Sequence, residues 1–169
     1  KTGTKEMLRL CLDTQGSTAA SAGNLNNHWG LPLSLCRVPA DTAFTVLEIG
    51  MNHSNEIRPL VKIARPHVAI VTAVEPAHTE YFASVDEIAD AKAEIFEGVE
   101  VGGAAVINRD SPYFGRLAAA ARDAGVERII GFGHDDEADV KLVHAELTAN
   151  ESSVEAAIHG SIIRYRIGA

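Results

Sequence analysis

Residues 1–135 alternate short apolar runs of strand length with segments that have the hydrophobic period of a helix. The run over 68–74 is the strongest strand candidate, because Pro66 and Pro76 bound it and proline is excluded from central strands. Strands that alternate with helices build a parallel sheet with helices packed on its faces. We therefore predict an α/β fold, with a mostly parallel sheet wound with helices.

The expected elements follow from this alternation. Helices are predicted over 4–12, 30–36, 54–64, 85–99 and 112–124, and strands over 44–49, 68–74, 104–107 and 128–130. Ser54 is the expected N-cap of the helix over 54–64. From residue 139 on, apolar and polar residues alternate around a turn at His159 and Gly160, which is typical of antiparallel strands. We predict a sheet core over 1–135 followed by an antiparallel β segment over 136–169.

Composition narrows the classes of protein that the chain can belong to. The chain has 169 residues, enough to bury a core without disulfides, and no apolar run approaches the about 18 residues of a membrane span. A formal net charge of −8 repels phosphate backbones, so we expect neither membrane insertion nor nucleic-acid binding. Cys11 and Cys36 lie in apolar stretches, which favours reduced core thiols in a cytoplasmic protein.

Polar side chains follow three of the predicted strands. In open parallel sheets, ligands bind outside the carboxyl ends of the strands. Carboxylate and imidazole groups are typical ligands of divalent metals, so their clustering favours a metal or ligand site. Each residue taken singly is equally consistent with a solvated loop, and Asn108 with a turn-forming amide. The residues are Glu48, Asn52, His53, Glu75, His78, Asn108, Arg109 and Asp110.

Lys92 occupies a core-facing position of the helix predicted over 85–99. The apolar stripe of this helix consists of Val85, Ile88, Ala89, Ile95, Phe96 and Val99, and Lys92 fills the gap in it. One interpretation is a side chain whose stem lies on apolar surface while its ammonium reaches solvent. The other is a desolvated amine with a lowered pKa, which could be modified or used in catalysis.

Lys1 and Thr2 stand directly before a predicted helix. They match the last two letters of the phosphate-binding loop G-x-x-x-x-G-K-[ST]. In that loop the lysine contacts the terminal phosphates and the hydroxyl binds magnesium. A Lys-Thr pair before a helix is by itself a weak signal of phosphate binding.

Several blocks of the sequence resemble the central domain of the Mur ligases. They are K-T-G-T-K-E-M at 1–7, G-N-L-N-N-H-W-G-L-P-L-S-L at 23–35, E-I-G-M-N-H-S-N-E-I at 48–57, A-H-T-E-Y-F at 77–82 and A-K-A-E-I-F at 91–96. The second and third blocks are similar to the member that joins D-alanyl-D-alanine to UDP-N-acetylmuramoyl-tripeptide. The lysine and histidine blocks belong to the wider superfamily, which includes folylpolyglutamate synthase.

The resemblance implies an ATP-dependent amide ligase of peptidoglycan synthesis, and therefore a part in cell wall biogenesis, cell shape and cell division. ATP would phosphorylate the carboxylate of the tripeptide, and the amine of the dipeptide would then displace phosphate. Residues 1–169 would form an incomplete ATP-binding central domain of a monomeric enzyme, without its N-terminal UDP-sugar domain and its C-terminal domain. We expect little or no activity from this chain alone. The alternatives are another Mur ligase, a folylpolyglutamate-type ligase, or a non-catalytic nucleotide-fold module.

The resemblance also implies roles for individual residues. Lys1 would hold the terminal phosphates, and Thr2 and Glu48 would bind a first magnesium ion. His78 would bind a second ion, and Lys92 would carry a carbamate made from carbon dioxide, which is a carboxylate-like magnesium ligand. Lys1, His78 and Lys92 would form the catalytic set. The remaining candidates are Asn108 for the nucleotide and Asn24, Asn27, Asn52 and His53 for the substrate.

Overall fold

Residues 1–76 and 80–168, which the computed structural model describes, form two sheets. The smaller sheet is a parallel pair of short strands, β1 (Thr18–Ala20) and β2 (Phe44–Val46). The larger sheet contains, in spatial order, β3 (Val68–Val71), β4 (Ala104–Asn108), β5 (Arg128–Gly133), β6 (Val140–Leu147), β7 (Glu151–Ile158) and β8 (Ser161–Gly168). Its pairs are parallel from β3 to β6 and antiparallel from β6 to β8. The predicted α/β fold is therefore confirmed.

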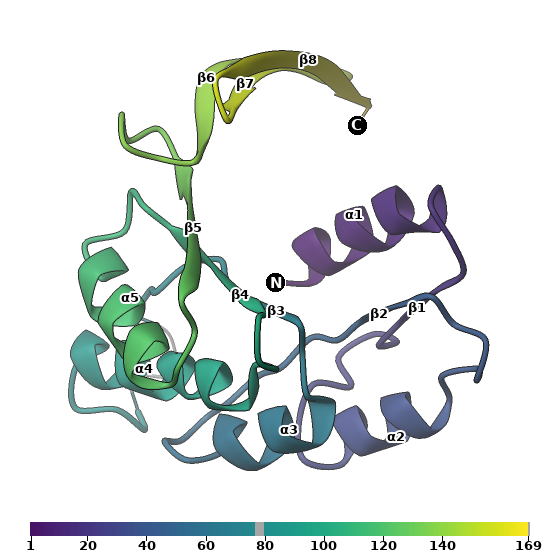
Figure 1. Ribbon diagram of the computed structural model, residues 1–169, viewed down its shortest axis with the longest axis vertical. Coiled ribbons are helices and arrows are strands. Elements are labelled where there is room, and N and C mark those ends of the chain that lie inside the picture. The colour runs from purple at the N-terminus through teal and green to yellow at the C-terminus, as the bar shows by residue number, and fades with distance from the viewer. Residues whose placement is uncertain (77–79, 169) are drawn as a thin grey trace.

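Helices pack on both sides of the parallel strands. They are α1 (Thr2–Asp13), α2 (Gly30–Cys36), α3 (Ile57–Ala64), α4 (Val85–Ala93), the 3₁₀ helix η1 (Glu94–Gly98) and α5 (Phe114–Asp123). Figure 1 shows α1 on one side of the β1–β2 pair and α2 and α3 on the other. No helix among the described residues is long and apolar enough to cross a membrane.

The main core lies between the parallel strands and the helices α4, η1 and α5. Ala105 and Ile107 of β4 are fully buried and pack with Phe96 of η1, which has no exposed surface. The 3₁₀ helix η1 also lies tightly on α3, because a Cβ atom added at Gly98 would stand 2.6 Å from the carbonyl oxygen of Val61. Only glycine permits this approach of the two segments.

Two predicted helices have different boundaries in the structure. The helix over 85–99 leaves the α-helical conformation after Ala93, and α3 begins at Ile57 rather than at Ser54. Both boundaries involve Glu94, the first residue of η1. Its buried carboxylate accepts hydrogen bonds from the backbone N–H of Asn55 at 2.5 Å and from that of Arg58 at 3.0 Å. The start of α3 is therefore capped by a side chain distant in sequence, so the prediction that Ser54 caps it is wrong.

The prediction that both cysteines lie in the core is also wrong, since Cys11 and Cys36 are exposed free thiols. Helix α1 packs on the short β1–β2 pair, and among its residues Lys5 is the buried one. The sheet in this region is too narrow to cover the Cys11 side of the helix. Strand β1 was not predicted, because three residues are too few to show a strand period.

Strands β6, β7 and β8 form an antiparallel arm that extends from the edge of the layered part (Figure 1). Strand β6 is parallel to β5 for only two residue pairs, Phe132 with Val140 and Gly133 with Lys141. The predicted turn at the end of β7 is confirmed, with positive φ angles of 48° at His159 and 80° at Gly160. The boundary expected after residue 135 falls in the loop between β5 and β6.

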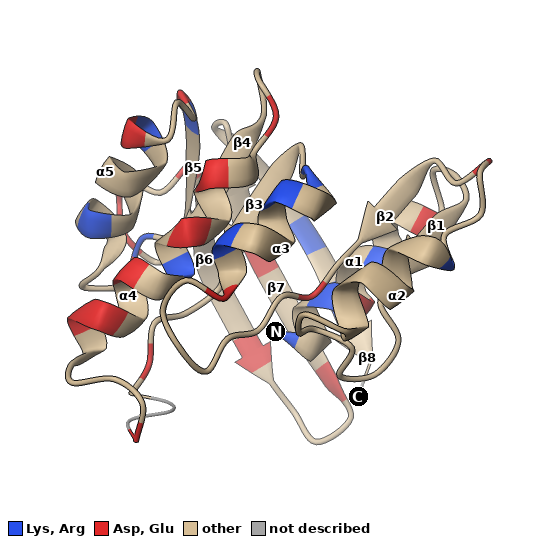
Figure 2. Cartoon of the chain, turned by 90° about the horizontal axis from the view of Figure 1, so that it is seen from below, with Lys and Arg blue, Asp and Glu red and all other residues tan. Residues whose placement is uncertain are grey.

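Charged side chains on the helices pair across neighbouring elements. Arg116 of α5 contacts Asp86 and Asp90 of α4. Arg58 of α3 contacts Glu97 of η1. Figure 2 shows the acidic positions of α4 near helix α5. The acidic side chains of this surface are thus partly balanced by local ion pairs.

Candidate functional site

The first turn of α1 and the end of β2 meet at a buried carboxylate. The Thr2 hydroxyl donates to Glu48 Oε2 at 2.9 Å, and the Asn26 side-chain amide donates to Glu48 Oε1 at 2.9 Å. The backbone N–H of Glu48 donates to the Ser21 hydroxyl at 3.1 Å. Both carboxylate oxygens and the backbone of Glu48 are therefore fixed by residues from other segments.

Glu48 is 8% exposed, yet it is held in its ionised form. Burial by itself would raise the pKa of this carboxyl. The hydrogen bonds from Asn26 and Thr2, with the charges of Lys1 and Lys5, outweigh burial and hold the pKa of Glu48 below its usual value. The structure thus presents an anionic oxygen ligand beside a hydroxyl at the N-terminus of a helix.

The half-buried Lys92 lies within electrostatic range of the same region. Burial lowers the pKa of the Lys92 amine, and the positive charge of Lys1 lowers it further, while Glu75 acts in the opposite direction. A lysine in this environment has a larger fraction of neutral amine at a given pH. The structure thus shows a partly buried Lys92 whose amine has a lowered pKa, and both interpretations of this residue stay open.

The donor set of this region fits magnesium. Mg²⁺ prefers hard oxygen ligands and is commonly held by one or two carboxylates together with substrate phosphates and water. Glu48 and Thr2 provide a carboxylate and a hydroxyl in direct contact. Within the described part of the chain, no group of three or more histidine, cysteine or acidic side chains could hold a metal ion. His78 lies outside the described residues.

The residues predicted to face the substrate are exposed. Asn27 accepts hydrogen bonds at its side-chain oxygen from the backbone of Trp29 and Gly30, and so fixes the start of α2. The backbone N–H of Asn52 donates to Glu56 at 2.7 Å. Nδ1 of His53 lies 3.0 Å from Glu56 Oε1, and the His53 ring contacts Tyr81 in a tilted arrangement with ring centroids 4.6 Å apart. Asn24 lies in the turn before Asn26.

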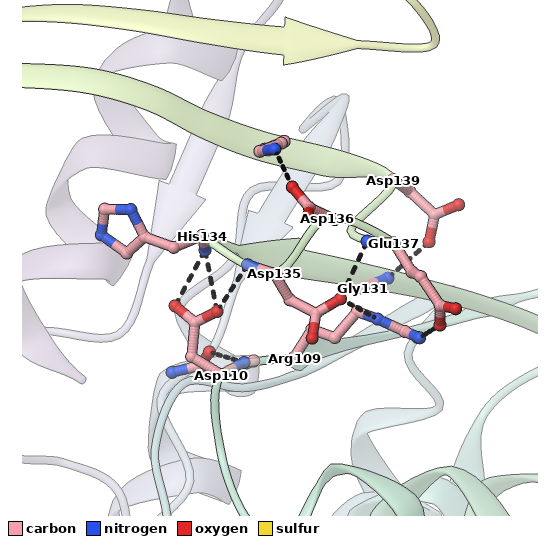
Figure 3. A network of polar contacts seen from close by, with 10 residues as sticks. Arg109, Asp110, Gly131, His134, Asp135, Asp136, Glu137 and Asp139 are labelled. Atoms are coloured by element: carbon pink, nitrogen blue, oxygen red, sulfur yellow. Dashed lines mark hydrogen bonds and ion pairs between the residues drawn. The ribbon is translucent and has the colours of Figure 1, made fainter.

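Asn108 belongs to a separate polar network at the carboxyl ends of β4 and β5 (Figure 3). Its side-chain oxygen accepts a hydrogen bond from the backbone N–H of Asp110 at 3.0 Å, as in the turn-forming alternative. Asp110 in turn accepts from the backbone N–H groups of His134 and Asp135, and Figure 3 shows this carboxylate beneath the loop that precedes β6. Arg109 forms ion pairs with Asp135 and Glu137.

Three residues of the Glu48 region, Asn26, Ser21 and Lys5, were not predicted from the sequence. Asn26, rather than Asn24 or Asn27, contacts Glu48, and nothing in a row of asparagines indicates which amide points toward the strand end. Lys5 is 3% exposed, and its position was recognisable. It precedes Leu8 by three residues and Leu12 by seven, so it stands in an apolar stripe as Lys92 does.

The fold is an α/β domain with a buried, hydrogen-bonded carboxylate after the end of β2. A family model described as the Mur ligase middle domain matches residues 1–168, and the chain belongs to this family. A relative, the UDP-N-acetylmuramoyl-tripeptide–D-alanyl-D-alanine ligase of Rickettsia prowazekii, is 37% identical over 143 residues, which are 85% of this chain and 32% of that protein.

Solved structures agree with this assignment. A crystal structure of MurF from Acinetobacter baumannii has a TM-score of 0.91 and 30% identity, and the match covers 98% of this chain and 36% of that one. MurF ligase from Thermotoga maritima, solved in complex with ADP, has a TM-score of 0.85 and 27% identity, with 98% and 37% covered. The chain therefore spans about a third of the length of these relatives.

Proposed function

We propose that this chain is the ATP-binding middle domain of a ligase that joins D-alanyl-D-alanine to UDP-N-acetylmuramoyl-tripeptide in peptidoglycan synthesis. The observation that carries the proposal is the contact of the Thr2 hydroxyl with the buried, ionised Glu48, next to the positive charge of Lys1. The names of the relatives support this choice over other ligases of the superfamily.

The first turn of α1 would bind the phosphates of ATP. Free backbone N–H groups at a helix N-terminus attract anions, and the Lys1 ammonium adds a positive charge there. Glu48 and Thr2 would hold a first magnesium ion and His78 a second. Bound magnesium would neutralise charge on the transferring phosphoryl group. The tripeptide carboxylate would then take the phosphoryl group, and the amine of the dipeptide would displace phosphate from the acyl phosphate.

Lys92 would become a magnesium ligand after modification. Its neutral amine nitrogen would attack the carbon of carbon dioxide and lose a proton to water, which gives a carbamate with two oxygen donors. Only the neutral amine carries the lone pair that this step needs, so the burial that lowers the pKa of Lys92 favours the reaction.

The remaining assignments concern the nucleotide and the substrate. Asn108 would contact the nucleotide from the end of β4. The exposed side chains proposed to face the substrate or to orient its ligands are Asn24, Asn27, Asn52 and His53. The complete enzyme would act as a monomer in the cytoplasm.

The test is phosphate release by the full-length protein that contains this chain. With ATP and Mg²⁺ present, release should require both the tripeptide nucleotide and D-alanyl-D-alanine, and mass spectrometry should detect the joined product. Replacing the tripeptide nucleotide by a folate and the dipeptide by glutamate tests the folylpolyglutamate-type alternative. Phosphate release that is independent of the dipeptide, or that requires another amine, would overturn the proposal.

Two variants and the isolated chain complete the test. Glu48→Gln keeps the shape of the side chain but removes its charge, and it should raise the magnesium concentration needed for half-maximal activity. The matched control is Glu127→Gln, which changes an exposed carboxylate in the turn before β5. The 169-residue chain alone should release little or no phosphate, because it spans only about a third of the relatives.

A further inference from the structure

Lys5 is a buried lysine that the proposed reaction does not use. It lies in the first turns of α1, where the helix dipole disfavours a cation, and its side chain is 3% exposed. Burying a charged group is unfavourable unless partners compensate for the lost water. The contacts of Lys5 therefore show which groups compensate for its burial.

Those contacts hold the segment that follows β1. Lys5 Nζ donates to the backbone carbonyl oxygen of Ser21 at 2.6 Å and, at 3.4 Å, to that of Gly23. It also lies 3.1 Å from Oε1 of Glu6, a half-exposed carboxylate. The ammonium thus ties α1 to the loop between β1 and α2.

Ser21 links this contact to the backbone of Glu48, the proposed magnesium ligand. Its backbone N–H donates to the Val46 carbonyl of β2 at 3.0 Å, and its hydroxyl accepts from the Glu48 N–H at 3.1 Å. Ser21 is 2% exposed, so water does not replace these bonds. A shift of Ser21 would therefore move the backbone of Glu48.

A second connection reaches the Glu48 carboxylate itself. Beyond Gly23, the same loop presents the Asn26 amide to Glu48 Oε1 at 2.9 Å. The Gly50 N–H donates to the Asn26 carbonyl at 2.8 Å and fixes that residue against the segment after β2. Lys5 thus acts on two parts of Glu48. It holds the Glu48 backbone through Ser21 and the Glu48 carboxylate through the loop that carries Asn26.

We propose that Lys5 is a positioning residue that orients Glu48 for magnesium, acting through Ser21 and the 21–26 loop. The proposal rests on the proposed function, because it takes Glu48 as a magnesium ligand. Groups that orient metal ligands typically change metal affinity about 10- to 100-fold when they are removed. Ser21 and Asn26 contact Glu48 directly and belong to this class, and Lys5 acts on Glu48 through them.

The experiment compares Lys5→Met with Lys62→Met in the full-length protein. Methionine keeps an unbranched stem but has no donor, and Lys62 is an exposed lysine of α3 outside the site. Binding of Mn²⁺, as a spectroscopic substitute for Mg²⁺, is measured in the presence of ADP by electron paramagnetic resonance. Lys5→Met should weaken Mn²⁺ binding about 10-fold or more, and Lys62→Met should leave it unchanged.

A second readout separates positioning from general loss of stability. In Lys5→Met, hydrogen exchange measured by mass spectrometry should accelerate in peptides over 21–27 and 46–50, but not in those over 104–108. Activity should be restored by higher magnesium concentration, with the maximal rate retained. Unchanged Mn²⁺ affinity, or a lower maximal rate that magnesium does not restore, would overturn the positioning role.

Ser21→Ala provides a test if Lys5→Met does not fold. It removes the hydroxyl that accepts from Glu48 but leaves the carbonyl that Lys5 contacts, and it should also weaken Mn²⁺ binding. Unchanged binding in this variant would contradict the proposal. Failure of the proposed function is distinct, because it would appear in the unmutated protein as a lack of phosphate release with both substrates.

Discussion

The parallel strands and the antiparallel arm bury their apolar residues to very different extents. In β4, Ala105 and Ile107 are fully buried between helices. In β8, Ile163 is 41% exposed and Tyr165 is 45% exposed, although these residues also alternate with polar ones. The register places Ile163 opposite Ala156 and Tyr165 opposite Val154, so the arm has one continuous apolar face.

The difference shows that alternation of apolar and polar residues places the apolar side chains on one face of a strand but does not bury that face. A sheet face is covered only when a second layer packs on it. In the parallel part, α4, η1 and α5 supply that layer. In the arm, the opposite face carries polar pairs such as Arg164 with Glu155, and no described helix covers the apolar face.

The largest effect is expected in the parallel part. Phe96→Ala should lower the free energy of unfolding of the 169-residue chain by about 3–5 kcal/mol, because it leaves a cavity in a fully packed core. Urea unfolding followed by circular dichroism measures the change. A loss below about 1 kcal/mol, the size of an average point mutation, would mean that this core is less tightly packed than its burial indicates.

A smaller effect is expected at the junction of η1 and α3. Glu94→Gln replaces a charged acceptor of two backbone N–H groups and should cost about 1.5–3 kcal/mol of the free energy of unfolding. The control, Glu97→Gln, removes an exposed ion pair with Arg58 and should cost at most about 1 kcal/mol. Equal losses in the two variants would contradict the role of Glu94 as the cap of α3.

The pH dependence of Lys92 reactivity tests the environment of the site. Because burial lowers its pKa, the neutral amine of Lys92 should form at lower pH than that of free Nα-acetyl-lysine. Each amine is acetylated with limiting acetic anhydride at a series of pH values, and mass spectrometry measures the extent of acetylation. The midpoint of its pH dependence reports the pKa of that amine. A midpoint for Lys92 at or above that of the free amine would remove the support for carbamate formation.

The smallest effect is expected in the arm. Tyr165→Thr should change the free energy of unfolding by no more than about 0.5 kcal/mol, because the side chain is already 45% exposed in the folded chain. The same variant should reduce the fluorescence of 1-anilinonaphthalene-8-sulfonate, a dye that binds exposed apolar surface. A loss of several kcal/mol, comparable with that of Phe96→Ala, would erase the contrast between the two regions.

Much of the fold was predictable because its signals are local. Hydrophobic period identified the strands β2 to β5, with two bounding prolines at β3, and the pair His159 and Gly160 identified the turn of the arm. The predictions failed where a distant residue decides the outcome. Ser54 is of a residue type that is common at N-caps, but the carboxylate of Glu94 accepts the hydrogen bonds of the backbone N–H groups at the start of α3 instead.

The sequence by itself determined the class of fold, the lysine in the stripe of α4, and the acid at the end of β2. Only the tertiary structure decided which residues act on that acid. Thr2, Asn26 and Ser21 reach Glu48 from segments 46, 22 and 27 residues away. Periodicity reports which side of an element is buried, but hydrogen bonds depend on the spatial approach of separate elements, and a linear pattern does not encode that approach.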